Sequence, residues 1–162
     1  MKKPFAGAIP APGLNAIGNM SSKQIRIVIV DDHTDVRKTW KLLLERDQRF
    51  AVVAECANAQ QAIDIAVKLV PDIILMEIDM SPLNGLEATK KILRQNPSMK
   101  IIGVSIDDQP SYALSMLKVG AKGYVTKNSS PAEMTFAIMK ILNGGQYICE
   151  EVQSKMRNGD EL

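Results

Sequence analysis

Short apolar segments alternate with longer amphipathic segments along most of the chain. The apolar segments are rich in Ile and Val, which is typical of strands that are buried on both faces of a sheet. We expect five strands, at residues 25–30, 50–54, 73–76, 101–104 and 123–126. Each is followed by a segment whose apolar residues recur at helical spacing. The expected helices lie near residues 33–45, 58–70, 84–96, 110–120 and 130–143.

Strict alternation of strand and helix predicts a parallel sheet with helices on both faces. The fold class is therefore α/β, a three-layer, doubly wound, five-stranded sheet of the flavodoxin-like kind. A strand order of 2-1-3-4-5 is one of the two common arrangements. In that order the first and third strands are neighbours. All the carboxyl ends then meet at one edge of the sheet, where ligands bind in open α/β folds.

Acidic residues follow the two strands that this order makes neighbours. Asp31 and Asp32 come directly after the first strand, and Glu77 follows the third. Three carboxylates at one spot repel one another, and a magnesium ion, which prefers oxygen ligands, is the usual remedy. Ser105 and Lys127 end the fourth and fifth strands at the same edge, and we expect Lys127 to pair with Glu77. The alternative is that the acidic residues are solvated turn formers.

Composition narrows the class of protein. The chain has 162 residues, enough for one ordinary domain, and its net charge of +2 indicates no electrostatic footprint for nucleic acid. Cys56 and Cys149 fit no metal or redox spacing, and a buried Cys56 suits a reducing compartment. No apolar run approaches the roughly 20 residues of a membrane span. We therefore expect a cytoplasmic protein that makes no membrane contact.

Several motifs together resemble the receiver domain of two-component response regulators. They are the Asp-Asp-His run at residues 31–33, the turn at 80–85, Ser105, and the segment Gly-Ala-Lys-Gly-Tyr-Val-Thr-Lys at 120–127. The residues of these motifs are most similar to those of the NarL/FixJ branch, whose members usually carry a LuxR-type output domain. The resemblance covers about residues 25–145. It implies a CheY-like fold and a signalling module rather than an enzyme.

The resemblance implies a weak magnesium site. Asp31 and Asp32 match the acidic pair that holds the ion in this family, and Asp32 is the expected direct ligand. The backbone carbonyl of Asp79 matches a further ligand, and Glu77 approaches the same place.

The resemblance also assigns the reaction and its switch. Lys127 matches the lysine that contacts the phosphoryl group, and Ser105 matches the hydroxyl that both assists the reaction and reports it. Tyr124 matches the switch aromatic. Magnesium and lysine offset the charge that builds on the phosphoryl oxygens, and positioning does most of the catalysis.

One position departs from the family pattern. The phosphoacceptor of the family is aspartate, and here Glu77 stands there, with its carboxylate about 1.5 Å further out, one C–C bond. Two hypotheses follow: Glu77 imitates the phosphorylated state, or the chain is a degenerate, phosphorylation-independent receiver that serves as a protein-interaction module. A magnesium-dependent phosphatase with a carboxylate nucleophile is disfavoured, because no second acidic motif ends the fourth strand.

Organisation and partners are predicted from the same observations. Residues 1–22, rich in Pro, Gly and Ala, are expected to be a disordered leader, and residues 23–145 the receiver domain. Residues 146–162 are expected to be a tail or the start of a linker to an output domain outside this chain. The implied partners are a sensor histidine kinase and a second copy of the chain, which docks through the last two predicted helices. DNA is expected to bind only to a C-terminal helix-turn-helix that this chain lacks.

Overall fold

Six parallel strands form one sheet in the computed structural model, which describes residues 23–159. The order across the sheet is β2-β1-β3-β4-β5-β6, so the predicted order of the first five strands is confirmed. The predicted disordered leader, residues 1–22, lies outside the described residues. The strands are β1 (Ile25–Val30), β2 (Phe50–Cys56), β3 (Ile73–Glu77), β4 (Ile101–Ser105), β5 (Gly123–Thr126) and β6 (Tyr147–Ile148).

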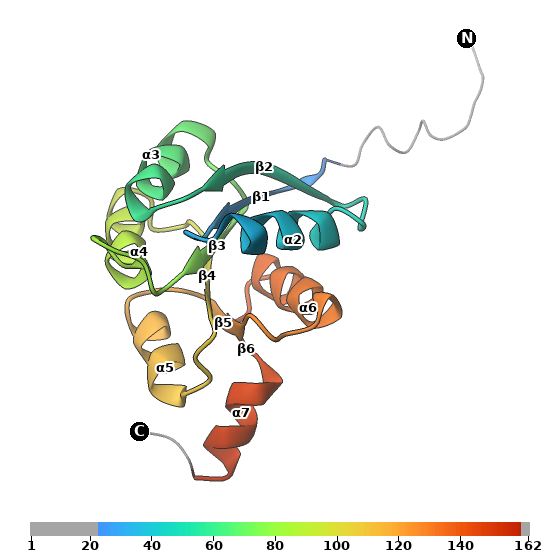
Figure 1. The fold of residues 1–162 in the computed structure, drawn as a ribbon, viewed down its shortest axis with the longest axis vertical. Coiled ribbons are helices and arrows are strands. Elements are labelled where there is room, and N and C mark those ends of the chain that lie inside the picture. Colours follow the sequence, from blue (N-terminus) through green and yellow to red (C-terminus); the bar gives the residue numbers. More distant parts are fainter. Residues whose placement is uncertain (1–22, 160–162) are drawn as a thin grey trace, which may run out of the picture.

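Helices cover both faces of the sheet, as the alternating pattern predicts. Helices α3, α4 and α5 lie on one face, and α2 and α6 lie on the other (Figure 1). Asn58, Asn84 and Ser130 each begin a helix by accepting a hydrogen bond from the backbone N–H three residues on. The helices are α2 (Thr34–Leu44), α3 (Ala59–Leu69), α4 (Gly85–Gln95), α5 (Pro110–Lys118), α6 (Pro131–Leu142) and α7 (Glu150–Arg157).

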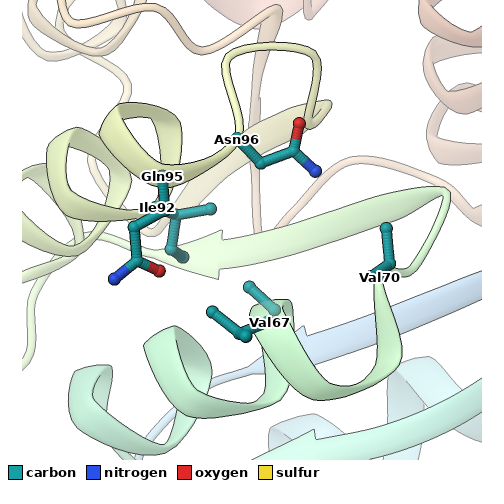
Figure 2. A pocket seen from close by; sticks show the side chains of 6 residues that line it. Val67, Val70, Ile92, Gln95 and Asn96 are labelled. Atoms are coloured by element: carbon teal, nitrogen blue, oxygen red, sulfur yellow. The ribbon is translucent and has the colours of Figure 1, made fainter.

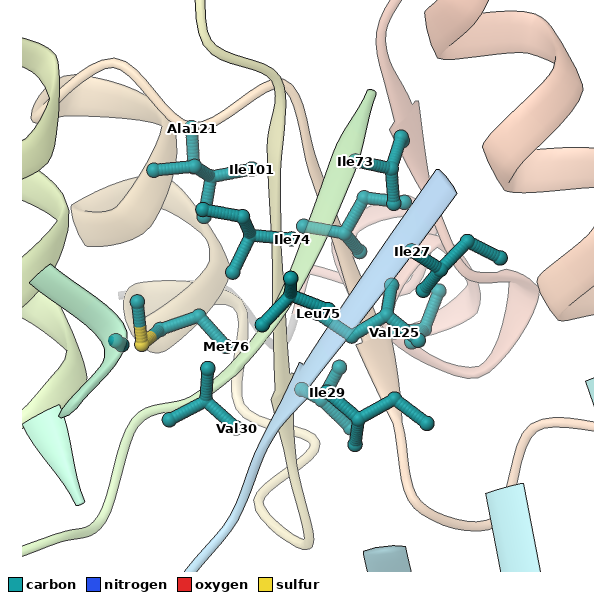
Figure 3. Close-up of a cluster of buried hydrophobic side chains, with 14 of the residues drawn as sticks. Ile27, Ile29, Val30, Ile73, Ile74, Leu75, Met76, Ile101, Ala121 and Val125 are labelled. Atoms are coloured by element: carbon teal, nitrogen blue, oxygen red, sulfur yellow. The ribbon is translucent and has the colours of Figure 1, made fainter. Parts of the chain in front are cut away.

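The core lies on both sides of the two central strands. Ile27 of β1 is paired with Ile73 of β3, and Val30 with Met76, and all four are buried. Figure 3 shows Ile27 and Ile73 on one side of the sheet and Val30 and Met76 on the other. Because successive residues of a strand face opposite sides, both faces must be apolar when helices cover both. This explains the continuous apolar runs in the sequence.

The sixth strand and the helix after it are additions that the sequence pattern did not predict. The backbone N–H of Tyr147 donates to Lys122 O over 3.1 Å, and that of Cys149 donates to Tyr124 O over 2.9 Å. Helix α7 buries Val152 and packs against α5. A two-residue strand is too short to show periodicity, and it is held by backbone groups that carry no sequence signal. Ordered structure therefore continues past residue 145, where the sequence suggested a tail.

An apolar hollow of about 400 Å³ lies between α3 and α4 (Figure 2). Val67 and Val70 are exposed there, and Val70 has a φ of 44°, which is uncommon for a β-branched residue. None of the residues predicted for the functional site lines this hollow. Within residues 23–159, no helix combines the length and apolar character needed to cross a bilayer.

Candidate functional site

Two buried carboxylates lie side by side at the carboxyl edge of the sheet. Glu77 is the last residue of β3 and is 3% exposed, and Asp31, which directly follows β1, is also 3% exposed. Gly85 closes the turn after β3, and its N–H donates to Ile78 O over 2.9 Å. A Cβ atom at this glycine would lie 2.1 Å from the Glu77 carbonyl oxygen, so the close approach requires glycine.

Lys127 joins the two carboxylates. Its Nζ lies 2.8 Å from Asp31 Oδ2 and also contacts Glu77 Oε1. The backbone N–H of Lys127 donates to Ser105 O over 2.8 Å, which fixes the residue directly after β5 beside the end of β4. The predicted pairing of Lys127 with Glu77 is therefore confirmed, and the same lysine also neutralises Asp31.

The surroundings of Glu77 and Lys127 shift the pKa values of both groups. Burial raises the pKa of Glu77, and the hydrogen bonds from Lys127 and from the Asp79 N–H offset this only in part. Burial acts to lower the pKa of Lys127, but its hydrogen bonds with Asp31 and Glu77 outweigh that effect and raise it. The lysine therefore stays charged at neutral pH, as the role of a fixed counter-charge requires.

Asp32 and His33 form the open side of the cluster. The imidazole Nδ1 of His33 lies 3.1 Å from Asp31 Oδ1 and 3.0 Å from Asp32 Oδ1, and the Asp32 side chain is 42% exposed. Ligand atoms of Asp31, Asp32 and His33 lie within 4.8 Å of one another, so these residues fit a divalent cation that prefers carboxylate oxygen. Both Glu77 oxygens already have partners. A contribution from Glu77 or from the Asp79 carbonyl stays a prediction.

Ser105 ends β4 and Tyr124 lies in β5, and both side chains are fully buried. Ser105 Oγ donates to Asp79 Oδ2 over 3.2 Å and accepts from the Asp107 N–H over 3.1 Å. The Tyr124 hydroxyl donates to Asp107 O over 2.5 Å, and burial raises its pKa well above the ordinary range. Gly103 gives the ring room, because a Cβ there would lie 3.3 Å from Tyr124 Cδ1. The two predicted switch residues are therefore linked through Asp107.

The side chain of Asp79 is the functional group that the sequence analysis missed. Only its backbone carbonyl was assigned a role, yet its carboxylate binds Ser105 and its N–H donates to Glu77 Oε2 over 2.7 Å. The signal was present, since Asp79 and Ser105 follow adjacent strands of the predicted order. A second missed contact is the pair Lys155–Asp108, 3.0 Å apart, which joins α7 to the segment between β4 and α5.

Comparison with known proteins agrees with this geometry. Residues 27–139 match the response regulator receiver domain family. The chain is 36% identical to the transcriptional regulatory protein DegU of Brevibacillus brevis over 133 residues, which are 82% of this chain and 56% of that protein. It is 33% identical to the response regulator GacA of Pseudomonas viridiflava over 132 residues, which are 82% of this chain and 62% of that protein.

A solved structure shows the same architecture. It is a two-component response regulator of the LuxR family from Aurantimonas sp. SI85-9A1, with a TM-score of 0.81 and 34% identity. The match covers 85% of this chain and 98% of the solved one. The chain spans only about three fifths of the length of the curated relatives named above. From its fold, its site and these similarities, the chain belongs to the receiver domains of two-component response regulators, of the LuxR/NarL type.

Proposed function

We propose that this chain is the signal-input domain of a transcription regulator, and that Glu77 occupies the phosphoacceptor position and imitates the phosphorylated state. The observation that carries the proposal is the contact of the Glu77 carboxylate with Lys127, beside Asp31, at the carboxyl edge of the sheet. Ser105 and Tyr124 are both present and buried, and Ser105 O accepts the Lys127 N–H. A site that had lost its function would not be expected to keep every residue but one.

The imitation is partial on physical grounds. A glutamate carboxylate reaches about 1.5 Å further than an aspartate, towards the place of a phosphoryl group. It carries one negative charge, whereas a phosphoryl group carries about two. Lys127 and the Asp79 N–H already bind both of its oxygens. The proposed state therefore resembles the phosphorylated one in position more than in charge.

Magnesium and partners complete the proposal. Asp31 and Asp32 hold the ion weakly, and a sensor histidine kinase is the partner of an aspartate-bearing form of the site. DNA contact belongs to an output domain outside this chain. A second copy docks on the surface formed by α5, β5 and α6. Because β6 extends the sheet beside β5 and α7 packs on α5, the exposed Phe136 of α6 marks the accessible part of that surface.

Labelling with acetyl phosphate and magnesium tests the phosphoacceptor assignment. In the Glu77→Asp variant, a carboxylate oxygen should attack phosphorus, release acetate and form an acyl phosphate that mild alkali removes. The parent chain and the matched Glu77→Gln variant should stay unlabelled, since ångström-scale misplacement or loss of the nucleophile abolishes in-line attack. Intact-mass measurement gives the readout.

The same experiment decides between the two hypotheses for the site. Labelling of the Glu77→Asp variant, with a change of its amide spectrum towards that of the parent chain, supports a switch altered at one residue. A variant that stays unlabelled, or that labels without a spectral change, favours a fixed protein-interaction module.

A further inference from the structure

The hydrogen bonds of Glu77 leave Ser105 to a different carboxylate. Lys127 binds one Glu77 oxygen, and the Asp79 N–H donates to the other over 2.7 Å. Ser105 Oγ donates instead to Asp79 Oδ2 over 3.2 Å. Among residues 23–159, the carboxylate that meets the Ser105 hydroxyl therefore belongs to the residue two positions after β3.

The Ser105 hydroxyl is held by two partners of opposite kind. It donates to the Asp79 carboxylate and accepts from the Asp107 N–H, and these two bonds together define its orientation. Ser105 is fully buried, whereas Asp79 is exposed. The carboxylate therefore keeps part of its hydration while it satisfies a buried donor, so the contact avoids the cost of a fully buried charge.

Further contacts join the segment after Ser105 to β5 and to α7. The Asp107 carbonyl accepts the Tyr124 hydroxyl, and Lys155 of α7 binds Asp108. The segment between β4 and α5 is thus held at three points, by Ser105, by Tyr124 and by α7. Loss of the acceptor at Asp79 removes one of the two bonds that fix the Ser105 rotamer, and a change of that rotamer takes Oγ away from the Asp107 N–H.

We propose that Asp79 is the positioning residue that sets the Ser105–Tyr124 switch in this chain. Its carboxylate supplies the negative acceptor for the buried hydroxyl, and Glu77 contacts this acceptor residue through the Asp79 N–H. That Ser105 and Tyr124 act as a switch rests on the proposed function. The hydrogen bonds that hold them in this structure do not depend on phosphorylation. The present arrangement of Ser105 and Tyr124 should therefore survive Glu77→Gln, which keeps the side-chain length and an oxygen for the Asp79 N–H.

Amide hydrogen exchange at Asp107 measures this directly, since its N–H is bound to Ser105 Oγ. Asp79→Ala should speed exchange there roughly tenfold, the value of one hydrogen bond to a charged group, and should shift the Tyr124 ring signals. Asp79→Asn, which keeps an acceptor oxygen, should restore most of the protection. Glu77→Gln, which keeps an oxygen for the Asp79 N–H, should leave Asp107 exchange unchanged.

A double-mutant cycle separates positioning from general stability. In a Ser105→Ala background the Asp79→Ala change should add no further increase at Asp107, because the two residues act through one bond. Additive effects would overturn the proposal. The proposal would also be overturned by an unchanged exchange rate at Asp107 in Asp79→Ala. An equal loss of protection there in Glu77→Gln would overturn it too. Should Asp79→Ala fail to fold, Asp79→Leu, which also removes the acceptor at this exposed position, takes its place in the cycle. Acetyl phosphate labelling of Glu77→Asp tests the proposed function alone, so the two can fail separately.

Discussion

The two ends of the central strands carry charged residues of the same kinds but use them differently. At the amino end, Arg26 Nη1 donates to Leu69 O over 2.7 Å and to Val70 O over 3.1 Å, and Asp72 Oδ2 accepts from the Arg26 N–H over 2.8 Å. Each charge there satisfies a backbone group. At the carboxyl end, Asp31, Glu77 and Lys127 bind one another and are largely shielded from water.

The comparison shows how a site differs from a structural contact. Charges that bind backbone groups near solvent fix the path of the chain, and loss of one leaves only neutral groups unsatisfied. Buried charges that depend on one another shift their own pKa values and cannot be removed singly without leaving a bare charge. Contacts of the first kind stabilise the fold. Contacts of the second kind, among Asp31, Glu77 and Lys127, form a site whose charge balance changes when one group is altered.

The largest effect is expected for Lys127→Ala. This change leaves Asp31 and Glu77 buried without their counter-charge, so the free energy of unfolding should fall by about 3–5 kcal/mol. Magnesium should then stabilise the variant more than the parent, because the ion replaces the missing positive charge. Urea unfolding with and without magnesium is the measurement, and Lys127→Arg is the control that keeps the charge. An equal magnesium response in parent and Ala variant would contradict the prediction.

A smaller effect is expected for Arg26→Ala at the amino end. The carbonyls of Leu69 and Val70 lose their donor but remain close to solvent, so the loss should be about 1–3 kcal/mol. Magnesium should not alter this loss of stability. The same urea series gives the value, and a magnesium-dependent loss would show that the two ends of the sheet are coupled.

The smallest effect is a difference in pH dependence. Burial raises the folded-state pKa of Glu77 above 4.5, so the folded chain holds this proton more tightly than the unfolded chain. The resulting contribution to the free energy of unfolding is fully present below pH 4.5 and is lost as the pH rises through the folded-state pKa. The parent should therefore lose stability relative to Glu77→Gln when the pH increases above 4.5, as followed by urea unfolding at several pH values.

Glu45→Gln provides the control of opposite sign. The Val52 N–H, followed by Lys41, lowers the pKa of Glu45 below 4.5, so its contribution is present above 4.5 and is lost as pH falls through the lowered value. The parent should lose stability relative to Glu45→Gln in acid. If the stability difference from the parent changed with pH in the same direction for both variants, neither pKa shift could be assigned to the surroundings of its own residue.

The sequence predicts the parts of the fold that are decided by burial and strand order. Asp31, Glu77 and Lys127 could be placed together, because the strand order makes the ends of parallel strands meet at one edge. β6 could not be predicted, because it is held by carbonyls of Lys122 and Tyr124 and shows no side-chain period. Helix α7 is mostly polar and buries a single residue, Val152, so its sequence has no apolar stripe of the kind that marks the other helices. The strand order could place Asp79 close to Ser105, but the hydrogen bond between their side chains depends on the Asp79 rotamer, which the order does not fix.

The sixth strand also determines where this domain can be cut. The exposed backbone of an edge strand can pair with another chain, and here the edge next to Tyr124 is closed by only two residues, Tyr147 and Ile148. A version that ended at Gly145 would leave the Lys122 and Tyr124 carbonyls without their donors. Such a fragment would tend to add strands from its neighbours, and the aggregates that formed could be mistaken for a signalling dimer.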